Sequence, residues 1–466
     1  MTLNDFTWKL KEFWNDFKKE KTGLIGLGIL LFSLLVVIFE PFFLPYREAN
    51  TKWRSIDYWQ DNPAGAAPAW TNWFSSKKSA KTMEITDFSE KDEINPHYGA
   101  VKTYNFEYNY TADLAPADII FRVQGNKKVF FNIEVIRPDG EELHLGQFQK
   151  QNAVHESIRF STQADGRSAT RQFAQSHGAS SASGNARPTE ILFSKAERDM
   201  LRKKEALKGV YTFKVSIPES IAANADNGFT NPKIIVAGKV SGVLGTDIQK
   251  RDVFSGIIAG LKWALFIGII TSMISVLIGV LYGIVSAYFG GFVDTMLSFI
   301  FEIFVSIPIL PVLIVVSAAF KPSIWVIVLA LIIFSWVGPV KTVRSMALQI
   351  KEETYIEAAK ALGSGKWRII FKHMMPLLLP YSFASMALNV PGTIVFEASL
   401  SLLGLGDPTI VTWGQILHDA QVSGATLNGL WWWIIPPGLF IALMGMTFAF
   451  LGFAMDKILH PKLRTR

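Results

Sequence analysis

The stretch from Trp263 to Val293 decides the fold class of this chain, because it reads WALFIGIITSMISVLIGVLYGIVSAYFGGFV and contains no charged residue. A helix needs about 20 apolar residues to cross the hydrocarbon core of a bilayer. Five further apolar runs, of which only the second contains a charged residue, Glu302, are Thr22–Phe39, Thr295–Phe320, Ser323–Val340, Met374–Phe396 and Leu430–Met455. A buried core helix could explain one such run but not all six. The sequence therefore predicts an all-α polytopic membrane protein with six transmembrane helices.

Composition narrows the function classes. The chain has 466 residues, of which 50% are hydrophobic and 18% charged, with no cysteine and a net charge of +7. This composition excludes a mostly disordered chain, a disulfide-stapled scaffold, a cysteine-based metal site and a thiol nucleophile. The small charge excess indicates no nucleic-acid partner. The histidines of the polar segment are scattered without ligand spacing, so neither a metal site nor a cofactor is expected.

Lysine and arginine set the predicted orientation, because they concentrate in cytoplasmic loops. They are frequent before the first apolar run, in the loop 341–375 and after Met455, whereas Ala398–Gly429 has none. Both termini are therefore expected in the cytoplasm of a multi-pass inner membrane protein. The first run could be a signal peptide. It is followed by Glu40-Pro41-Phe42-Phe43, which has no small-residue cleavage pattern, and so we interpret 22–44 as a retained transmembrane helix.

Residues 1–21 carry an apolar stripe at helical spacing. Its members are Leu3, Phe6, Leu10, Phe13 and Phe17. The stripe fits a cytoplasmic amphipathic helix in the membrane interface, or a short helix packed on a neighbour.

Residues 45–245 have a soluble composition and form a predicted extracytoplasmic, β-rich insertion between helices 1 and 2. Strand-like alternation occurs at 104–108, 130–136, 210–217 and 234–240, and Arg137-Pro138-Asp139-Gly140 reads as a hairpin turn. Gln163–Arg187 is rich in small residues and is expected to be a flexible excursion, and Glu197–Leu207 a short helix. A sandwich is the expected architecture.

The predicted cytoplasmic loop, about 341–375, contains a helix–glycine–helix pattern. Val343–Leu362 lacks proline and glycine and is expected to be one helix, which Gly363 ends in a left-handed conformation. Trp367–Phe371 restarts a helix, and Pro376 marks the start of the fifth span. A rigid basic knob of this kind is suited to docking on a soluble partner.

This loop resembles the EAA loop of ABC importer permeases. The resemblance is carried by Glu357, Ala358, Ala359 and Gly363, with Pro376 thirteen residues further on. In that family the loop forms a coupling helix that docks onto a cytoplasmic ATPase, so these first four residues are the implied ATPase-coupling site.

Other motifs are similar to those of the oligopeptide/dipeptide (C-type, binding-protein-dependent) permeases. They are Gly245-Thr246-Asp247 with Arg251-Asp252, the turn Ala287–Asp294, the segment Glu397–Gly406 and Trp413-Gly414. Lys250 stands where the family has glycine. The resemblance implies that 246–466 is a permease core of the ABC importer type I fold. It also implies oligopeptides or dipeptides as cargo. The implied partners are a homologous second permease subunit, two cytoplasmic ATPase subunits, an extracytoplasmic solute-binding protein and membrane lipid.

No nucleotide site is encoded here. Gly363-Ser364-Gly365-Lys366 would need glycine at Lys360 and Ser or Thr at Trp367 to form a phosphate-binding loop. The chain is therefore expected to be a transporter subunit and not an enzyme. A secondary transporter, or a membrane-anchored sensor or assembly protein that uses the extracytoplasmic domain, remains as an alternative.

Two carboxylates fall in or near the apolar runs, Glu302 in the third and Glu397 at the outer end of the fifth. Because an ionised group inside a bilayer is costly, such residues usually face a protein interior or a wet path. Glu302 and Glu397 are therefore candidates for the translocation path or the partner subunit, and a structural pairing with a neighbouring helix is the alternative. Pro308 and Pro311 are expected to interrupt the third span.

Overall fold

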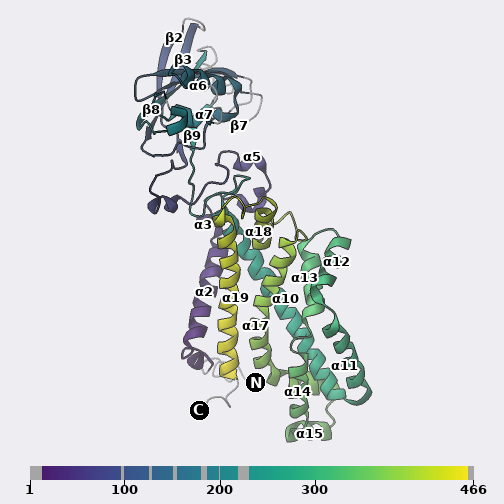
Figure 1. The fold of residues 1–466 in the computed structure, drawn as a ribbon. Coiled ribbons are helices and arrows are strands. Elements are labelled where there is room, and N and C mark those ends of the chain that lie inside the picture. The colour runs from purple at the N-terminus through teal and green to yellow at the C-terminus, as the bar shows by residue number, and fades with distance from the viewer. Residues whose placement is uncertain are drawn as a thin grey trace. The chain divides into compact units, whose positions relative to one another are not determined.

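The structure, a computed structural model, describes residues 13–95, 99–124, 129–150, 155–179, 186–198, 200–218 and 230–459. The chain divides into two compact units. Met1–Arg54 with Ser255–Arg466 forms the helical unit, and Ser55–Phe254 forms the unit that holds every strand of the described residues (Figure 1).

Long apolar helices build the helical unit. Three of them are α2 (Lys21–Ile38), α10 (Val253–Phe289) and α19 (Trp431–Leu459), and the fourth is the continuous rod Lys366–Leu402 that ends in α17 (Met375–Leu402). Among the described residues these four are each long and apolar enough to cross a membrane, and the number rises to six if each of two bent helix pairs counts as one span. Four of the six apolar runs that predict spans fall mainly in these helices, and the other two fall on the bent pairs.

The two bent pairs have identifiable causes. In the first pair, α11 (Gly291–Ser306) and α12 (Ile309–Ala319) meet at 79°, and Pro308 is the N-cap residue of α12. The expected interruption at Pro308 is confirmed, because proline disfavours helical geometry in the residue before it. The expected interruption at Pro311 is wrong, because Pro311 lies in the first turn of α12, where proline is tolerated. In the second pair, α13 (Ile324–Ser335) and α14 (Val340–Lys351) meet at 47°, with Pro339 as the N-cap of α14.

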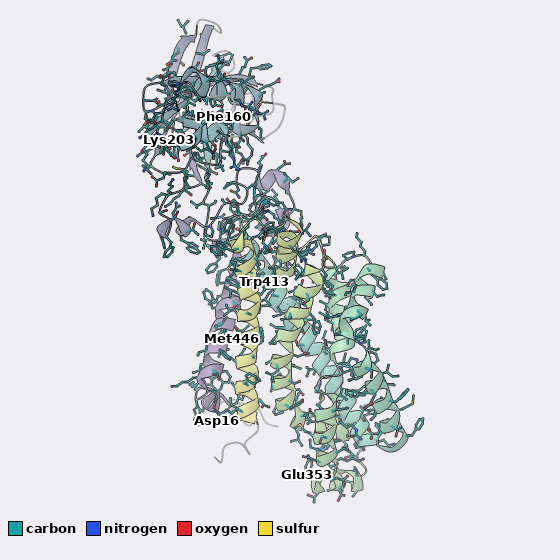
Figure 2. All side chains as sticks on the ribbon, viewed as in Figure 1. Asp16, Phe160, Lys203, Glu353, Trp413 and Met446 are labelled. Carbon is teal, nitrogen blue, oxygen red and sulfur yellow. The ribbon has the colours of Figure 1, made fainter. Side chains whose placement is uncertain are left out.

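Small residues allow the helices to approach closely. A Cβ atom on Gly26 of α2 would lie 2.8 Å from the Thr447 carbonyl oxygen of α19, so only glycine fits there. Trp413, the first residue of α18 (Trp413–Val422), is buried and donates its indole N–H to the Ile257 carbonyl of α10 at 2.9 Å (Figure 2). Two single-turn helices, α3 (Glu40–Phe43) and α4 (Ala49–Lys52), follow α2. Of the predicted N-terminal stripe, Leu3, Phe6 and Leu10 lie outside the described residues, whereas Phe17 is buried against Gly23.

The strand-bearing unit contains two antiparallel sheets. The four-stranded sheet has the order β1 (Met83–Ile85), β9 (Thr230–Ala237), β4 (Asp118–Gln124) and β7 (His155–Arg159). The five-stranded sheet has the order β2 (Ser89–Asn95), β3 (Gly99–Tyr110), β8 (Gly209–Pro218), β5 (Val129–Ile136) and β6 (Glu142–Lys150). The predicted strands are confirmed in β3, β5, β8 and β9, and the predicted hairpin turn joins β5 to β6.

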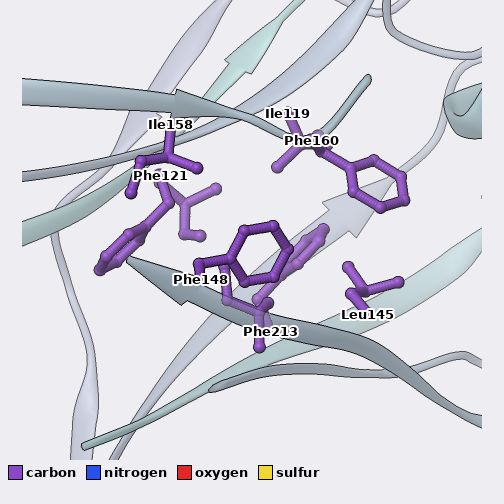
Figure 3. Close-up of a pocket in the computed structure, with 9 residues that line it drawn as sticks. Ile119, Phe121, Leu145, Phe148, Ile158, Phe160 and Phe213 are labelled. Atoms are coloured by element: carbon purple, nitrogen blue, oxygen red, sulfur yellow. The ribbon is translucent and has the colours of Figure 1, made fainter. Parts of the chain in front are cut away.

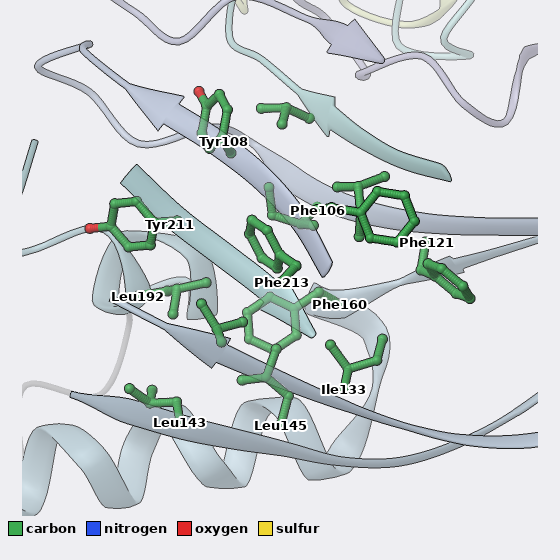
Figure 4. Packing of buried hydrophobic residues seen from close by; sticks show 14 of the residues in the cluster. Phe106, Tyr108, Phe121, Ile133, Leu143, Leu145, Phe160, Leu192, Tyr211 and Phe213 are labelled. Carbon is green, nitrogen blue, oxygen red and sulfur yellow. The ribbon is translucent and has the colours of Figure 1, made fainter. Parts of the chain in front are cut away.

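Alternating side chains from both sheets share one apolar core (Figure 4). Phe121 of β4 contacts Phe131 of β5 with ring centroids 4.9 Å apart, which links the sheets directly. A cavity of about 10 Å³ remains between them, lined only by apolar side chains such as Phe148 and Phe213 (Figure 3). This volume is about that of one water probe and offers a water no polar partner, so the cavity is expected to be dry.

Two expectations for this unit are wrong. Within Gln163–Arg187, residues Ala164–Ser176 form helix α6, because its Phe173 is buried in the core and Gly166 lies against the Phe160 ring. Residues 180–185 lie outside the described residues. Among the described residues of Glu197–Leu207, helix is confined to α8 (Met200–Lys203), because the chain folds back so that the Lys195 N–H donates to the Glu205 carbonyl at 2.8 Å. The remaining short helices are α5 (Ile56–Trp59), η1 (Ala69–Trp73), η2 (Phe160–Thr162) and α7 (Pro188–Leu192).

Tyrosines at one end of the core differ in how their hydroxyls are satisfied. The Tyr211 hydroxyl donates to the Leu207 carbonyl at 2.9 Å, whereas the buried Tyr110 hydroxyl has no hydrogen-bond partner among the described residues. Burial raises the pKa of both phenols, and it raises the pKa of Tyr108 to about 12. All three therefore stay neutral at physiological pH.

This difference predicts opposite responses to removal of one oxygen. Tyr110→Phe is expected to leave the free energy of unfolding unchanged or to raise it by up to about 1 kcal/mol, because a buried unpaired hydroxyl is lost. Tyr211→Phe is expected to cost about 1 kcal/mol, because it breaks a made hydrogen bond. Thermal unfolding of the full chain in detergent, followed by near-UV circular dichroism, compares the two variants. Equal destabilisation by both would contradict the assignment.

Candidate functional site

The EAA-like loop does not form the single helix expected over Val343–Leu362. Helix α14 ends at Lys351, and α15 (Thr354–Ala361) starts after a break at Glu352 and Glu353, the second of which has an extended backbone (Figure 2). The expectation is wrong because tertiary packing overrides helix propensity here. The break turns α15 so that Ile356 enters the helical core.

Ile356 anchors α15 in a core that four other segments build. Its side chain is fully buried and joins a cluster with α10, α14, α17 and the π-helical segment η5 (Ile369–Met374). The other buried members are Val276, Val280, Ile284, Ala287, Val343, Ala347, Ile369, Ile370, Met374 and Leu378. A displacement of α15 therefore requires movement or repacking of the parts of those helices that contact Ile356.

Two residues of the EAA motif, Glu357 and Ala358, face away from this anchor, whereas Ala359 lies nearer to it. Glu357 and Ala358 are exposed, and Ala359 is half-buried at the edge of the packed side. Successive helical residues are 100° apart, which places the first two on the outward face when Ile356 points inward. The motif thus offers one carboxylate and a methyl-sized surface that a partner can approach closely.

Gly363 ends α15 as predicted. It has φ of +78°, its N–H donates to the Lys360 carbonyl, and the Ser364 N–H donates to the Ala359 carbonyl, both at 3.0 Å. This is the Schellman arrangement, which satisfies the last carbonyls of a helix and reverses the chain. Helix α16 (Lys366–Arg368) then leads through η5 into α17, so the predicted helical restart is confirmed.

Basic side chains of the loop hold it against aromatic rings at the end of α10. The Lys360 ammonium lies 6.0 Å from the Tyr288 ring centroid, and the Lys366 ammonium 5.5 Å from that of Phe289. Phe289 also contacts Trp367, with ring centroids 6.1 Å apart. Cation–π contacts of this kind are worth about 0.5–1 kcal/mol when exposed.

A charged cluster missed by the sequence analysis joins three helices beside the loop. The Arg344 guanidinium of α14 donates to both carboxylate oxygens of Asp294 in α11, at 2.7 and 2.5 Å, and the Ser286 hydroxyl of α10 donates to the same carboxylate. Two-point Arg–carboxylate pairing fixes geometry as well as distance. The sequence shows both charged residues, but it does not show that they pair, because fifty positions separate them.

The two candidate path carboxylates lie in different surroundings. The Glu302 side chain on α11 is 68% exposed and lies 3.7 Å from the Lys341 ammonium. Glu397 is buried near the end of α17, where it accepts from the Ser401 hydroxyl at 2.7 Å and is also hydrogen-bonded by Thr412. Each thus has a structural partner, and their role in a path stays a prediction.

Glu397 belongs to a polar layer at the junction of α17 and α18. Gly414 packs against Ala398, where a Cβ atom would lie 2.7 Å from the Ala398 Cα. The Arg54 guanidinium reaches the same layer, donating to Asp419 at 2.9 Å and to the Gln415 side chain at 3.2 Å. The layer ties the end of the segment after α2 to α18.

The signature Gly245–Asp252 forms a closed clasp in the strand-bearing unit. Arg251 donates from its side chain to Asp247 at 2.5 Å and from its backbone N–H at 2.8 Å, and Thr246 pairs with Asp252 as an antiparallel bridge. The Thr246 hydroxyl also donates to the Pro63 carbonyl at 2.7 Å. The clasp therefore joins the segment that enters this unit to the segment that leaves it.

Lys250 keeps the turn that the family makes with glycine. Its φ is +68°, a left-handed conformation that costs a residue with a Cβ atom roughly 1–2 kcal/mol. Burial lowers the pKa of Lys250, and the nearby Arg159 lowers it further.

Two family models match parts of this chain. Residues 275–465 match the family described as the binding-protein-dependent transport system inner membrane component, and residues 9–63 match the N-terminal TM domain of oligopeptide transport permease C. Neither match includes residues 64–274.

Curated relatives carry transport names. The dipeptide transport system permease protein DppC of Bacillus subtilis is 37% identical over 47% of this chain and 68% of its own length. The oligopeptide transport system permease protein OppC of Haemophilus influenzae is 34% identical over 47% of this chain and 70% of its own. A structure titled inward facing conformations of the MetNI methionine ABC transporter covers 45% of this chain and 97% of its own at 19% identity. Its TM-score of 0.32 is too low to support an argument.

The anchor and the outward face of the loop predict separable effects. Ile356→Ala is expected to cost about 2–5 kcal/mol of local stability, because it leaves a cavity in the packed cluster. Hydrogen exchange of the α15 amides should accelerate accordingly. Leu362→Ala, whose side chain is 87% exposed, should leave exchange unchanged and is the matched control. Equal exchange in the two variants would contradict the anchor.

The Lys250→Gly variant is expected to be more stable than Lys250→Ala by about 1 kcal/mol, because glycine adopts a left-handed conformation without strain and alanine does not. Both variants remove the charge beside Arg159, so their difference isolates the backbone term. Thermal unfolding of the full chain measures it. If the alanine variant is equally stable, then Lys250 does not store strain.

Proposed function

This chain belongs to the family of inner membrane components of binding-protein-dependent transport systems, and from that premise we propose that it imports oligopeptides or dipeptides. Its relatives are permease subunits of ABC transporters, so the chain is a permease subunit and not an enzyme, and separate subunits hydrolyse ATP. The peptide cargo is supported by the names of those relatives, which include dipeptide, oligopeptide and glutathione permeases.

The observation that carries the coupling role is the two-sided placement of α15. Glu357, Ala358, Ala359 and Gly363 form the proposed ATPase-docking surface, while Ile356 ties the same helix to the core of the permease. A movement of the docked ATPase subunits is passed through this anchor to α10, α14 and α17. The Asp294–Arg344 pair extends the connection to α11.

In the proposed topology the two bent pairs each count as one span, which gives six. Both termini and α15 lie in the cytoplasm, and residues 45–245 lie outside it. The even number of spans and the lysines around α15 support this arrangement. The complete importer contains a homologous second permease subunit, two ATPase subunits and a solute-binding protein.

Of the two path candidates, Glu302 has the exposure that a path or a partner-facing role requires, and its contact with Lys341 holds the charge on the surface of the single chain. The burial of Glu397 supports a structural role at the junction of α17 and α18. Uptake by Glu302→Gln tests the first role, because full uptake would remove Glu302 from the path.

Disruption of the docking face is expected to separate membrane insertion from ATPase binding. Gly363→Pro removes the N–H bonded to Lys360 and cannot adopt positive φ, so α15 loses its terminus. Glu357→Lys reverses the charge of the docking face. Both variants should insert into the membrane normally, but the amount of ATPase that co-purifies with them should fall at least tenfold.

Two matched variants serve as controls for these changes. Gly365→Ala lies two residues away at negative φ with open space around it, and Glu352→Lys reverses a charge outside α15. Both should retain the ATPase. Normal co-purification by Gly363→Pro and Glu357→Lys would overturn the docking assignment.

A further inference from the structure

Large apolar side chains are exposed where the strand-bearing unit begins and ends. Residues 55–74 and 241–252, here called the root segments, hold five of the ten large hydrophobic side chains that are exposed in the described part of this unit. They are Ile56, Trp73, Phe74, Val243 and Ile248. Trp73 and Phe74 are consecutive and are 76% and 82% exposed. Water-exposed aromatic pairs are unusual in a soluble domain and mark an interaction surface.

The aromatic pair is held in place within the unit. The Trp70 indole N–H donates to the Val243 carbonyl at 2.9 Å, and the Ala69 N–H donates to the Gly242 carbonyl at 3.0 Å. These bonds fix η1 to the segment that leads into the clasp. In the clasp, the Gly245 carbonyl accepts a hydrogen bond from the N–H of Val253, which is the first residue of the apolar helix α10. Trp73 and Phe74 are therefore bonded, through a short series of contacts, to the start of a membrane helix.

We propose that Trp73 and Phe74 insert into the interface of the bilayer leaflet that adjoins this unit, with Lys77 and Lys78 at the level of the lipid phosphates. Tryptophan is enriched at the boundary between headgroups and acyl chains, and lysines beside an apolar contact attract anionic lipids. The sequence Trp73-Phe74-Ser75-Ser76-Lys77-Lys78 provides both chemistries in one exposed turn, in which the Lys78 ammonium also donates to the Asn72 carbonyl at 2.6 Å.

Chain length permits this contact. Twelve residues separate Phe43, the end of α3, from Ile56, and nine separate Val243 from α10. An extended chain spans about 3.3–3.6 Å per residue, so these two linkers limit the distance between the root segments and the membrane helices to about 30–43 Å. The unit is thus tethered to a bilayer at all times, whereas a soluble partner is present only when it binds. The flanking lysines also favour phosphate groups over an apolar protein surface.

Fluorescence quenching tests the proposal, because the chain has no cysteine and a single introduced one is labelled uniquely. The full chain with Phe74→Cys is labelled at this cysteine with an environment-sensitive fluorophore. It is reconstituted in nanodiscs of phosphatidylcholine and phosphatidylglycerol, whose lipids carry a nitroxide quencher near the top of the acyl chain. Ile94→Cys on β2 is the matched control, since Ile94 is 86% exposed in the same unit. We expect at least threefold stronger quenching at 74 than at 94. Equal quenching of the labels at 74 and 94 overturns the proposal. Shielding of the label at 74 by an added protein partner, without stronger quenching at 74 than at 94, overturns it as well.

A second labelled position keeps both aromatic rings in place. Ser75→Cys should show the same strong quenching, and the double change Trp73→Ser with Phe74→Ser in that background should reduce it to the level at 94. Quenching that survives the double change would overturn the role of the aromatic pair. The readout needs no ATPase or cargo, so it fails or succeeds independently of the proposed transport function.

Discussion

The burial of Ile356 is the contact on which the proposed coupling depends. A single side chain from an eight-residue helix fills a core made by the ends of much longer helices. An isolated helix of that length is not stable in water, so α15 exists because this packing supports it. Its orientation follows from the same contact, because an inward Ile356 leaves the acidic and methyl-sized residues of the motif on the outside.

Electrostatic contacts surround this anchor and restrict its motion. Asp294 and Arg344 join α11 to α14 by a two-point pair, and the lysines of the loop lie over aromatic rings of α10. These groups sit at the ends of the helices, where a small displacement changes many contacts. The left-handed Gly363 then reverses the chain within two residues, so that the segment after α15 returns toward α17.

The strand-bearing unit uses a different device to join its two ends. Within this unit its entering and leaving segments meet at the clasp around Asp247 and Arg251, where buried charges are paired and hydrogen-bonded. Such pairs are costly to break because one partner would remain buried and uncompensated. Lys250 adopts its left-handed conformation within this closure although lysine does not favour it. The sandwich beyond it has a core of its own, and neither family match includes residues 64–274.

By itself, the sequence determined the features that depend on composition and on short-range chemistry. Apolar runs of sufficient length predict spanning helices because lipid offers the backbone no hydrogen-bond partner, and alternation, turn residues and Gly363 predict strands, hairpin and helix end. Only the tertiary structure decided the rest. It broke the Val343–Leu362 helix at Glu353, folded 164–176 into α6 and brought Asp294 to Arg344. The reason is physical: each of these outcomes depends on burying a side chain, or pairing a charge, against residues distant in the chain, and no local pattern encodes which distant residues those will be.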